Sequence, residues 1–266
     1  MTAHVLLNAN NIESHLTPTC LTLISVLDIF DHIDSTNRYL MSQAQNNAPS
    51  GAVCFANSQT AGKGRQGRQW VSPQGANIYG SFLWHFNNVA LLNGLSLAIG
   101  VGVIRVLQKY GILDVGLKWP NDIYSDSKKL GGILIEVTSR PDGKASAVIG
   151  LGLNIDLPPH IDSITQAYTD LKTIAPHVTL ERNTLIAHLL NELLPITATF
   201  ETQGLSAYVD EWRQYDCLKG KVATLYVGKQ AIQGTVKGID NHGLLKLQHA
   251  DGMETVFTSG EVSFSQ

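Results

Sequence analysis

The sequence predicts an α+β protein with one large mixed domain and one small β-rich domain. In the first 217 positions, short runs of alternating or continuous apolar residues indicate strands, and longer apolar stretches between them indicate helices. After residue 218, four short β-rich runs are separated by glycine-containing turns, a spacing typical of a small barrel. We therefore expect a short N-terminal segment at residues 1–27, a main domain at 28–217 and a C-terminal domain at 218–266.

The composition indicates a compact protein with no general attraction to nucleic acid or membranes. The chain has 266 residues, enough to bury a sizeable core, and a formal net charge of −3. Because no basic stretch precedes an apolar core at the N-terminus, we expect no secretion signal and a cytoplasmic location. The cysteines are far apart and form no metal-ligand pair or disulfide framework, which suits a reducing cytosol. They are Cys20, Cys54 and Cys217.

The first part of the chain is expected to alternate strands and helices. Residues 1–27, interrupted by the helix-breaking Pro18, are too short to form a domain of their own. A short helix is expected at residues 38–45, and a long apolar helix at residues 91–110, ended by Gly111, should be buried and not span a membrane. One further strand, with apolar side chains at every second position, should be half-buried. The predicted strands are residues 27–33, 51–58 and, as the half-buried one, 77–86.

The rest of the main domain should contain a hairpin and two helices. The hairpin covers residues 128–155, and residues 158–178 are expected to be irregular. Thr179 should cap an amphipathic helix that Pro195 kinks or ends. A second amphipathic helix is expected at residues 205–216.

The most unusual stretch is QTAGKGRQGRQW at residues 59–70, which we call the basic loop. Glycine supplies backbone freedom, and glycines interleaved with cations can wrap an anion with N–H groups and guanidinium forks. A dinucleotide-binding fingerprint would need a helix directly after the loop, and a phosphate-binding Walker loop would need a closing Gly-Lys-Ser/Thr. A solvated surface loop is the alternative interpretation. The alternating residues are Gly62, Lys63, Gly64, Arg65, Gly67 and Arg68.

Two further polar clusters follow predicted strands, one after residues 27–33 and the other after a short strand expected at residues 115–117. Ser35 and Thr36 can cap the next helix, and the same hydroxyls could bind a ligand carbonyl. In the turn KWPND, the side chains of Lys118, Asn121 and Asp122 suit phosphate and Mg²⁺. A surface turn with an ion pair is the plain alternative there.

The hairpin carries a third cluster of candidate residues. Lys129 stands at the mouth of an apolar strand, either as a solvated gatekeeper or as a cation for a ligand. The glycines within these strands mark places where a ligand or another backbone comes close. They are Gly131, Gly132, Gly150 and Gly152.

Taken together, these stretches closely resemble biotin protein ligases. The order and spacing match from about residue 28 to the end of the chain. The resemblance implies a catalytic domain like that of class II aminoacyl-tRNA synthetases, a mixed sheet flanked by helices, followed by an SH3-like C-terminal β-barrel. The stretches are DSTN at 34–37, GKGRQGRQW at 62–70, KWPNDIY at 118–124, KLGGILIE at 129–136 and GLGLNI at 150–155.

The resemblance implies a two-step reaction. The biotin carboxylate attacks the α-phosphorus of ATP and gives biotinyl-5′-AMP and pyrophosphate. A lysine of the biotin carboxyl carrier protein of acetyl-CoA carboxylase then takes the biotin as an amide. An anion that attacks a polyphosphate needs cations and Mg²⁺ to offset repulsion. The mixed anhydride is water-sensitive, so a basic loop that closes over it would exclude solvent.

By motif position, the resemblance also implies three overlapping groups of site residues. The biotin-binding group is Ser35, Thr36, Asn37, Gln59, Gly62, Lys63, Gly64, Arg65, Lys129 and Gly132. The ATP- and adenylate-binding group is Arg65, Arg68, Trp70, Lys118, Asn121, Asp122, Asn154 and Tyr168. The catalytic group is Arg65, Arg68, Lys118, Asp122 and Lys129. Mg²⁺ would be held mainly by the ATP phosphates, with Asp122 as the candidate protein ligand.

The chain departs from the family pattern in the basic loop, which commonly reads GRGRRGR in the family. Lys63 keeps the charge of the arginine it replaces but loses the bidentate fork, and Gln66 removes a charge. The resemblance therefore carries no charged phosphate contact over to Gln66. Tyr168 is the nearest candidate for the tryptophan that some relatives place against the adenine.

Other classes of function remain as alternatives. Lipoate and octanoate ligases share a related fold, but the full basic loop and the C-terminal barrel favour biotin. A biotin-responsive repressor would need a DNA-binding domain before the core, for which residues 1–27 leave no room, so we expect no specific DNA binding. A nicotinamide oxidoreductase would need a helix after Gly67. We also expect the protein to be able to form a homodimer.

Overall fold

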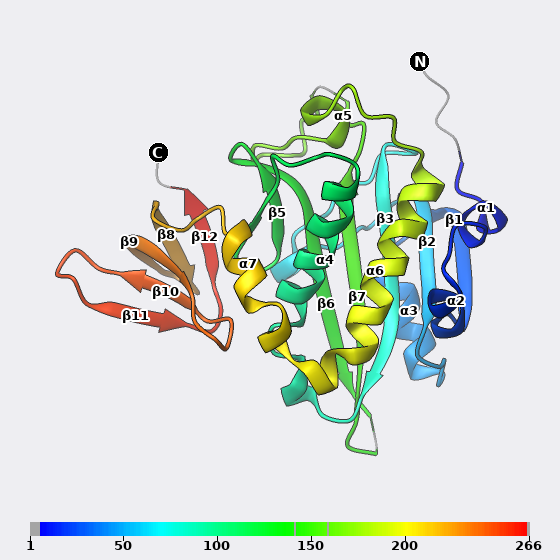
Figure 1. The fold of residues 1–266 in the computed structure, drawn as a ribbon, viewed down its shortest axis with the longest axis horizontal. Coiled ribbons are helices and arrows are strands. Elements are labelled where there is room, and N and C mark those ends of the chain that lie inside the picture. Colours follow the sequence, from blue (N-terminus) through cyan, green and yellow to red (C-terminus); the bar gives the residue numbers. More distant parts are fainter. Residues whose placement is uncertain (1–5, 141, 159, 265–266) are drawn as a thin grey trace.

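A computed structural model describes residues 6–140, 142–158 and 160–264 (Figure 1). Its centre is a seven-stranded sheet in the order β1-β2-β3-β7-β6-β5-β4, in which only β1 and β2 of the neighbouring pairs run parallel. The predicted hairpin is β6 and β7, and β5 is a strand that the sequence analysis missed. The strands are β1 (Val26–Ile33), β2 (Ala52–Gln59), β3 (Asn77–Phe86), β4 (Gly116–Lys118), β5 (Asp122–Ser125), β6 (Lys128–Ser139) and β7 (Ala145–Asn154).

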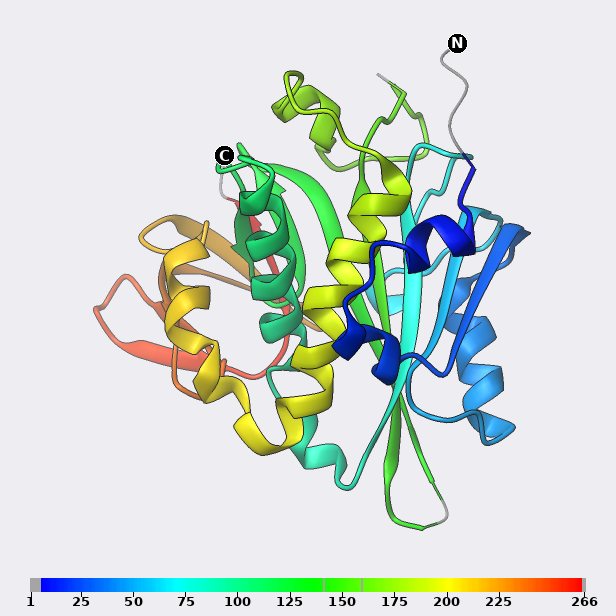
Figure 2. The same cartoon turned by 45° about the vertical axis from the view of Figure 1, so that its right-hand side comes forward.

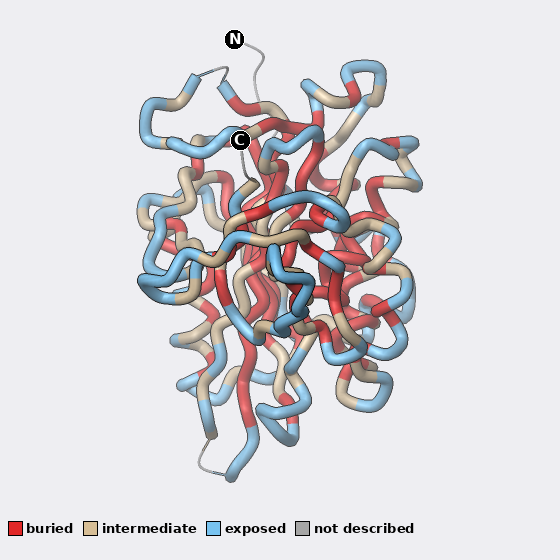
Figure 3. The backbone as a smooth tube through the Cα atoms, turned by 90° about the vertical axis from the view of Figure 1, so that its left-hand side faces the viewer, coloured by how far each residue is buried: buried red, intermediate tan, exposed pale blue. Residues whose placement is uncertain are grey.

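Helices cover both faces of this sheet. In Figures 1 and 2, α4 (Leu95–Lys109) and α6 (Arg182–Gln203) lie on one face and α3 (Thr36–Gln45) lies on the other. The expectation that β3 is half-buried was therefore wrong, because both of its faces are covered and eight of its ten residues are buried. Figure 3 shows buried segments of the backbone running through the centre of the molecule, with exposed segments around them.

Helix α4 is buried, as predicted, although it begins later. A short 3-10 turn (Val89–Leu92) precedes it, and the helix ends before Gly111, whose φ is +77°. By length and hydropathy, Val89–Lys109 is the one helical stretch among the described residues that could cross a membrane. Its side chains instead pack in the core against the sheet and α6.

Helix α6 corrects the expected N-cap and one of the two alternatives expected at Pro195. Its N-cap is Glu181, not Thr179, and the Glu181 carboxylate accepts hydrogen bonds from the N–H groups of Asn183 and Thr184. Pro195 lies inside the helix without ending it. The helix packs against α4 and α2. The next predicted helix is divided into a 3-10 turn (Leu205–Ala207) and α7 (Val209–Tyr215). The stretch expected to be irregular contains a short helix, α5 (Leu171–Ile174). Residue 159 of that stretch lies outside the described residues.

The N-terminal residues extend the main core. Helices α1 (Ala9–Glu13) and α2 (Pro18–Leu23) pack against α6. Pro18 occupies the first turn of α2, where its missing N–H costs nothing, so it begins a helix and does not break one. Ile12 and Cys20 are fully buried in the same core as the central sheet.

The C-terminal residues form a separate five-stranded antiparallel sheet beside the main one (Figure 1). The four predicted strands are present, and β12 is an additional strand that returns to the main sheet's side. The order is β11-β10-β9-β8-β12, with β8 (Val222–Val227), β9 (Gln230–Ile239), β10 (Leu245–Gln248), β11 (Glu254–Phe257) and β12 (Glu261–Phe264). The mixed α+β fold is thus as predicted.

Candidate active site

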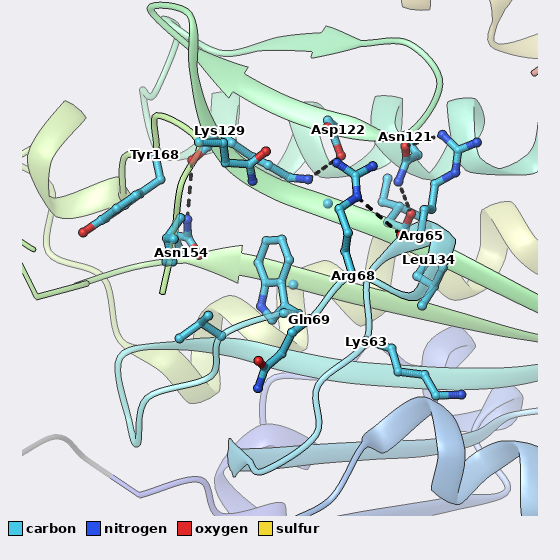
Figure 4. Close-up of a pocket in the computed structure, with 18 of the residues that line it drawn as sticks. Lys63, Arg65, Arg68, Gln69, Asn121, Asp122, Lys129, Leu134, Asn154 and Tyr168 are labelled. Atoms are coloured by element: carbon cyan, nitrogen blue, oxygen red, sulfur yellow. Dashed lines mark hydrogen bonds and ion pairs between the residues drawn. The ribbon is translucent and has the colours of Figure 1, made fainter. Parts of the chain in front are cut away.

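A cavity of about 910 Å³ lies where the basic loop, the β4–β5 turn, β6, β7 and β12 meet. We call it the main cavity. With one exception, it is lined by every site residue that the sequence analysis named. The exception is Gly62, which lines a second cavity of about 630 Å³ formed by the basic loop, Leu134 and Glu136. Figure 4 shows Lys129, Asp122, Asn121 and Arg65 gathered on one side of the main cavity.

Glycines in the central strands make room for Trp70. The β6–β7 register places Gly132 opposite Gly152. A Cβ atom at Gly152 would lie 2.5 Å from Trp70 Cε2, and one at Gly132 would lie 3.4 Å from Trp70 Cζ3. Gly152 therefore accommodates a side chain of this chain. At Gly131, a Cβ atom would lie 2.8 Å from the Gly152 carbonyl oxygen, which is the close approach of another backbone that the sequence analysis expected. Lys129 Nζ lies 5.5 Å from the centre of the Trp70 ring.

An amide cluster closes one part of the cavity at the start of α3. Ser35 caps the helix, as its alternative interpretation predicted, and its hydroxyl accepts from the Arg38 N–H. Gln59 Oε1 accepts from the Thr36 N–H at 2.9 Å and from the Thr36 hydroxyl at 3.2 Å. Ser81, buried on β3, donates to Asn37 Oδ1 at 2.6 Å. We call Thr36, Asn37, Gln59 and Ser81 the amide cluster.

Cations and a carboxylate occupy another part of the cavity. Lys129 Nζ and Asp122 Oδ1 form an ion pair at 2.8 Å. Arg65 Nη1 donates to Asn121 Oδ1 at 3.1 Å, and Asn121 Nδ2 in turn donates to the Ile133 carbonyl. Burial lowers the pKa of Arg65, an effect that the nearby Asp122 carboxylate opposes. The site thus holds cations whose charge is only partly compensated.

Lys118 is the most buried of these cations, with 8% of its surface exposed. Its Nζ donates to the Tyr124 hydroxyl at 3.2 Å and lies over the rings of Tyr124 and Phe264, 4.8 and 5.7 Å from their centres. Burial lowers the pKa of Lys118, and the nearby Asp122 carboxylate opposes this effect only in part. Phe264 comes from β12, so the C-terminal sheet completes this part of the site.

Two carboxylates outside the predicted set hold the basic loop. Lys63 Nζ pairs with Glu136 Oε1 of β6 at 3.0 Å, and Arg68 Nη1 pairs with Glu261 of β12. Glu136 is the last residue of the KLGGILIE motif, so the sequence could have indicated it as a site residue. No motif lies near Glu261. At the tip, Arg65–Gly67 forms a 3-10 turn with Gln66 at φ +55°.

The end of β7 and the segment after it form the remaining wall. Asn77 Nδ2 donates to Asn154 Oδ1 at 3.1 Å, and Asn154 Nδ2 donates to the Thr169 carbonyl at 3.0 Å. The segment around Tyr168 runs beside the start of β6, because the Lys129 N–H donates to the Ala167 carbonyl at 3.0 Å. Among the described residues, no three His, Cys, Asp or Glu side chains converge as a metal site.

Comparison with known proteins agrees with this geometry. Residues 29–154 match the Biotin/lipoate A/B protein ligase family, and residues 222–265 match the Biotin protein ligase C terminal domain. The Bifunctional ligase/repressor BirA of Escherichia coli is 38% identical over 260 residues, which are 97% of this chain and 78% of that protein. The Biotin--[acetyl-CoA-carboxylase] ligase of Mycobacterium tuberculosis is 31% identical over 243 residues, 89% of this chain and 88% of that protein.

A solved structure supports the same assignment. The biotin protein ligase of Aquifex aeolicus in complex with biotin and ATP superposes with a TM-score of 0.77 at 26% identity, covering 91% of this chain and 100% of that one. The chain belongs to the biotin protein ligases.

Proposed function

We propose that this protein activates biotin with ATP and transfers it to a carrier lysine. The observation that supports the proposal is the division of one cavity into an amide cluster at one part and cations at another. An amide cluster suits the ureido group of biotin, and cations suit a carboxylate and a triphosphate. Relatives whose names include biotin, ATP and acetyl-CoA carboxylase support the same ligands.

In the first step, a carboxylate oxygen of biotin forms a bond to the α-phosphorus of ATP, and pyrophosphate leaves. Arg65, Lys118 and Lys129 offset the repulsion between the two anions and stabilise the charge that spreads over the phosphate oxygens. The Asp122 carboxylate would supply one oxygen ligand to a Mg²⁺ ion bound with ATP, and the ion would help to neutralise the phosphate charge.

In the second step, the amine of a lysine on the carrier protein attacks the acyl carbon, and AMP leaves. Before this transfer the anhydride must be protected from water. The basic loop would cover it, with Trp70 and Asn154 beside the adenylate. The acceptor is the biotin carboxyl carrier protein of acetyl-CoA carboxylase.

The remaining assignments belong to the same proposal. We place the catalytic domain at residues 28–217 and the C-terminal domain at 218–266. The protein would act in the cytoplasm, without specific DNA binding, and would form a homodimer. Substrate contacts at Ser35, Gly62, Gly64, Gly132 and Tyr168 complete the proposed site.

Pyrophosphate exchange tests the proposed reaction. Incorporation of radiolabelled pyrophosphate into ATP should depend on biotin, and incorporation driven by lipoate or octanoate should be absent. The purified protein with MgATP is sufficient for this measurement. Exchange that responds to lipoate or octanoate and not to biotin would overturn the proposal in favour of the related acyl ligases.

A further inference from the structure

Glu136 joins two parts of the site that are far apart in the sequence. Its Oε1 accepts from Lys63 Nζ of the basic loop at 3.0 Å, and its Oε2 accepts from Asn37 Nδ2 of the amide cluster at 2.9 Å. The side chains of Lys63 and Glu136 are only 35% and 28% exposed, so solvent screens this ion pair less than a surface pair. In Figure 4, Lys63 lies apart from Arg65 and the other cations.

The second contact of Glu136 fixes the orientation of Asn37. Because Asn37 Nδ2 donates to Glu136, its Oδ1 is left to accept from the Ser81 hydroxyl. The space around Asn37 is tight, since a Cβ atom at Gly150 would lie 2.2 Å from Asn37 Oδ1. A turn of the amide would bring Asn37 Oδ1 against the Glu136 carboxylate, acceptor to acceptor, whereas the Ser81 hydroxyl can donate or accept. Glu136 therefore determines which atom of Asn37 faces which neighbour.

The loop side of the contact is equally confined. The Trp70 N–H donates to the Gly62 carbonyl at 2.9 Å, which joins the two ends of the basic loop. Gln59 Nε2 donates to the Ser72 hydroxyl at 3.1 Å, so the same glutamine holds Thr36 and the far end of the loop. Lys63 follows Gly62 directly. The pair with Glu136 therefore attaches the base of the loop to β6.

We infer that Glu136 is a positioning residue that couples the amide cluster to closure of the basic loop, and so sets how long the adenylate is retained. The inference rests on the proposed function and deepens it. Glu136 lines the second cavity and not the main one, so it acts through Lys63 and Asn37. Since it does not face the phosphate site, its loss should change dissociation of the ligand more than formation of the bond.

The test measures retention of the adenylate. Wild-type protein and variants form it from radiolabelled biotin and MgATP, are separated from free ligand, and are followed during a chase with unlabelled biotin. Glu136→Gln should release the adenylate about tenfold faster, as expected when an affinity loss is expressed in the off-rate. Its kcat for biotin-dependent pyrophosphate exchange should stay within about threefold of wild type, because the phosphate contacts are intact.

Three further variants make the test specific. Lys63→Met should also shorten retention, and the double variant Lys63→Met/Glu136→Gln should be no worse than the more affected single one. Lys63→Arg keeps the charge and should retain the adenylate longer than Lys63→Met. Lys109→Met is the matched control, because it breaks a Lys–Glu pair of the same 3.0 Å length with Glu192, away from both cavities.

The outcomes separate this inference from the proposed function. Equal retention by Glu136→Gln and wild type, or additive effects in the double variant, would overturn the inference. So would a loss of exchange rate as large as the loss of retention, since that would assign Glu136 to the chemical step. A wild-type protein that shows no biotin-dependent exchange would instead overturn the proposed function.

Discussion

Lys129 Nζ lies 2.8 Å from Asp122 Oδ1, and both side chains line the main cavity. The neighbouring Lys128 is exposed, because successive side chains of an extended strand point to opposite faces. Lys129→Ala should therefore slow biotin-dependent pyrophosphate exchange by an amount that corresponds to about 2 kcal/mol or more in the transition state. Lys128→Ala is the control. Equal and small effects of both substitutions on kcat/KM would contradict the proposed role of Lys129.

Arg65 should keep the adenylate in the site. Its Nη1 donates to Asn121 Oδ1 at 3.1 Å and lies 3.5 Å from the Gly260 carbonyl, so Arg65→Gly removes contacts with two segments beside the loop. Adenylation should slow, and the product should escape faster. Free anhydride would then label lysines of bystander proteins. The measurement is a streptavidin blot after incubation of the variant with biotin, MgATP and serum albumin.

Gln66→Gly is the control for loop flexibility. Gln66 already has φ +55°, a conformation that glycine adopts without strain, and the substitution leaves all three cations of the loop in place. It should label much less albumin than Arg65→Gly. If both variants label albumin equally, flexibility is the cause. If Arg65→Gly labels none, Arg68 becomes the better candidate for retention.

We expect Lys118 to be required for activity, although burial of its charge lowers the stability of the fold. Its burial lowers its pKa below the ordinary value of 10.5, so between the lowered pKa and 10.5 the unfolded chain binds more protons than the folded one. Stability linked to this group therefore rises with pH across that window. Lys118→Met removes the buried charge and should abolish exchange without lowering the free energy of unfolding at pH 7.

Urea unfolding at pH 7 and pH 9.5 checks this prediction. The difference in stability between Lys118→Met and wild type should shrink as the pH rises, because only the wild type gains from deprotonation. A Lys118→Met variant that is much less stable at pH 7 would mean that the contacts with Tyr124 and Phe264 outweigh the cost of burial.

Local patterns predicted the elements whose environment is set by neighbours in sequence. The strand at residues 77–86 was predicted with its observed bounds from alternating apolar side chains, and the buried helix that ends before Gly111 was predicted from its composition. The degree of burial was not predictable in the same way. Whether the second face of β3 is covered depends on α3, which comes from a distant part of the chain. At Pro195, a local signal that can end a helix does not end it, because α6 continues to Gln203.

In the site, too, residues within sequence motifs were predicted, and their partners from distant parts of the chain were not. Motif positions brought nearly all proposed ligand-binding residues to one cavity. The partners that hold them were missed, because a lone Ser81 on a buried strand or a lone Glu261 near the C-terminus carries no recognisable spacing. The glycines of β7 were recognised as points of close approach, but only the folded chain shows that Trp70 and Asn37 occupy the space.

The basic loop forms one ion pair with each of the two sheets, through Glu136 on β6 and Glu261 on β12. A protein that is divided at residue 217 would lose the second ion pair together with Phe264, even if each piece kept its own sheet. The two halves are therefore not interchangeable modules. If the C-terminal sheet of another ligase is grafted onto this chain, it must carry an acidic residue opposite Arg68. Without that residue, the loop would lack its second ion pair even in a folded chimera.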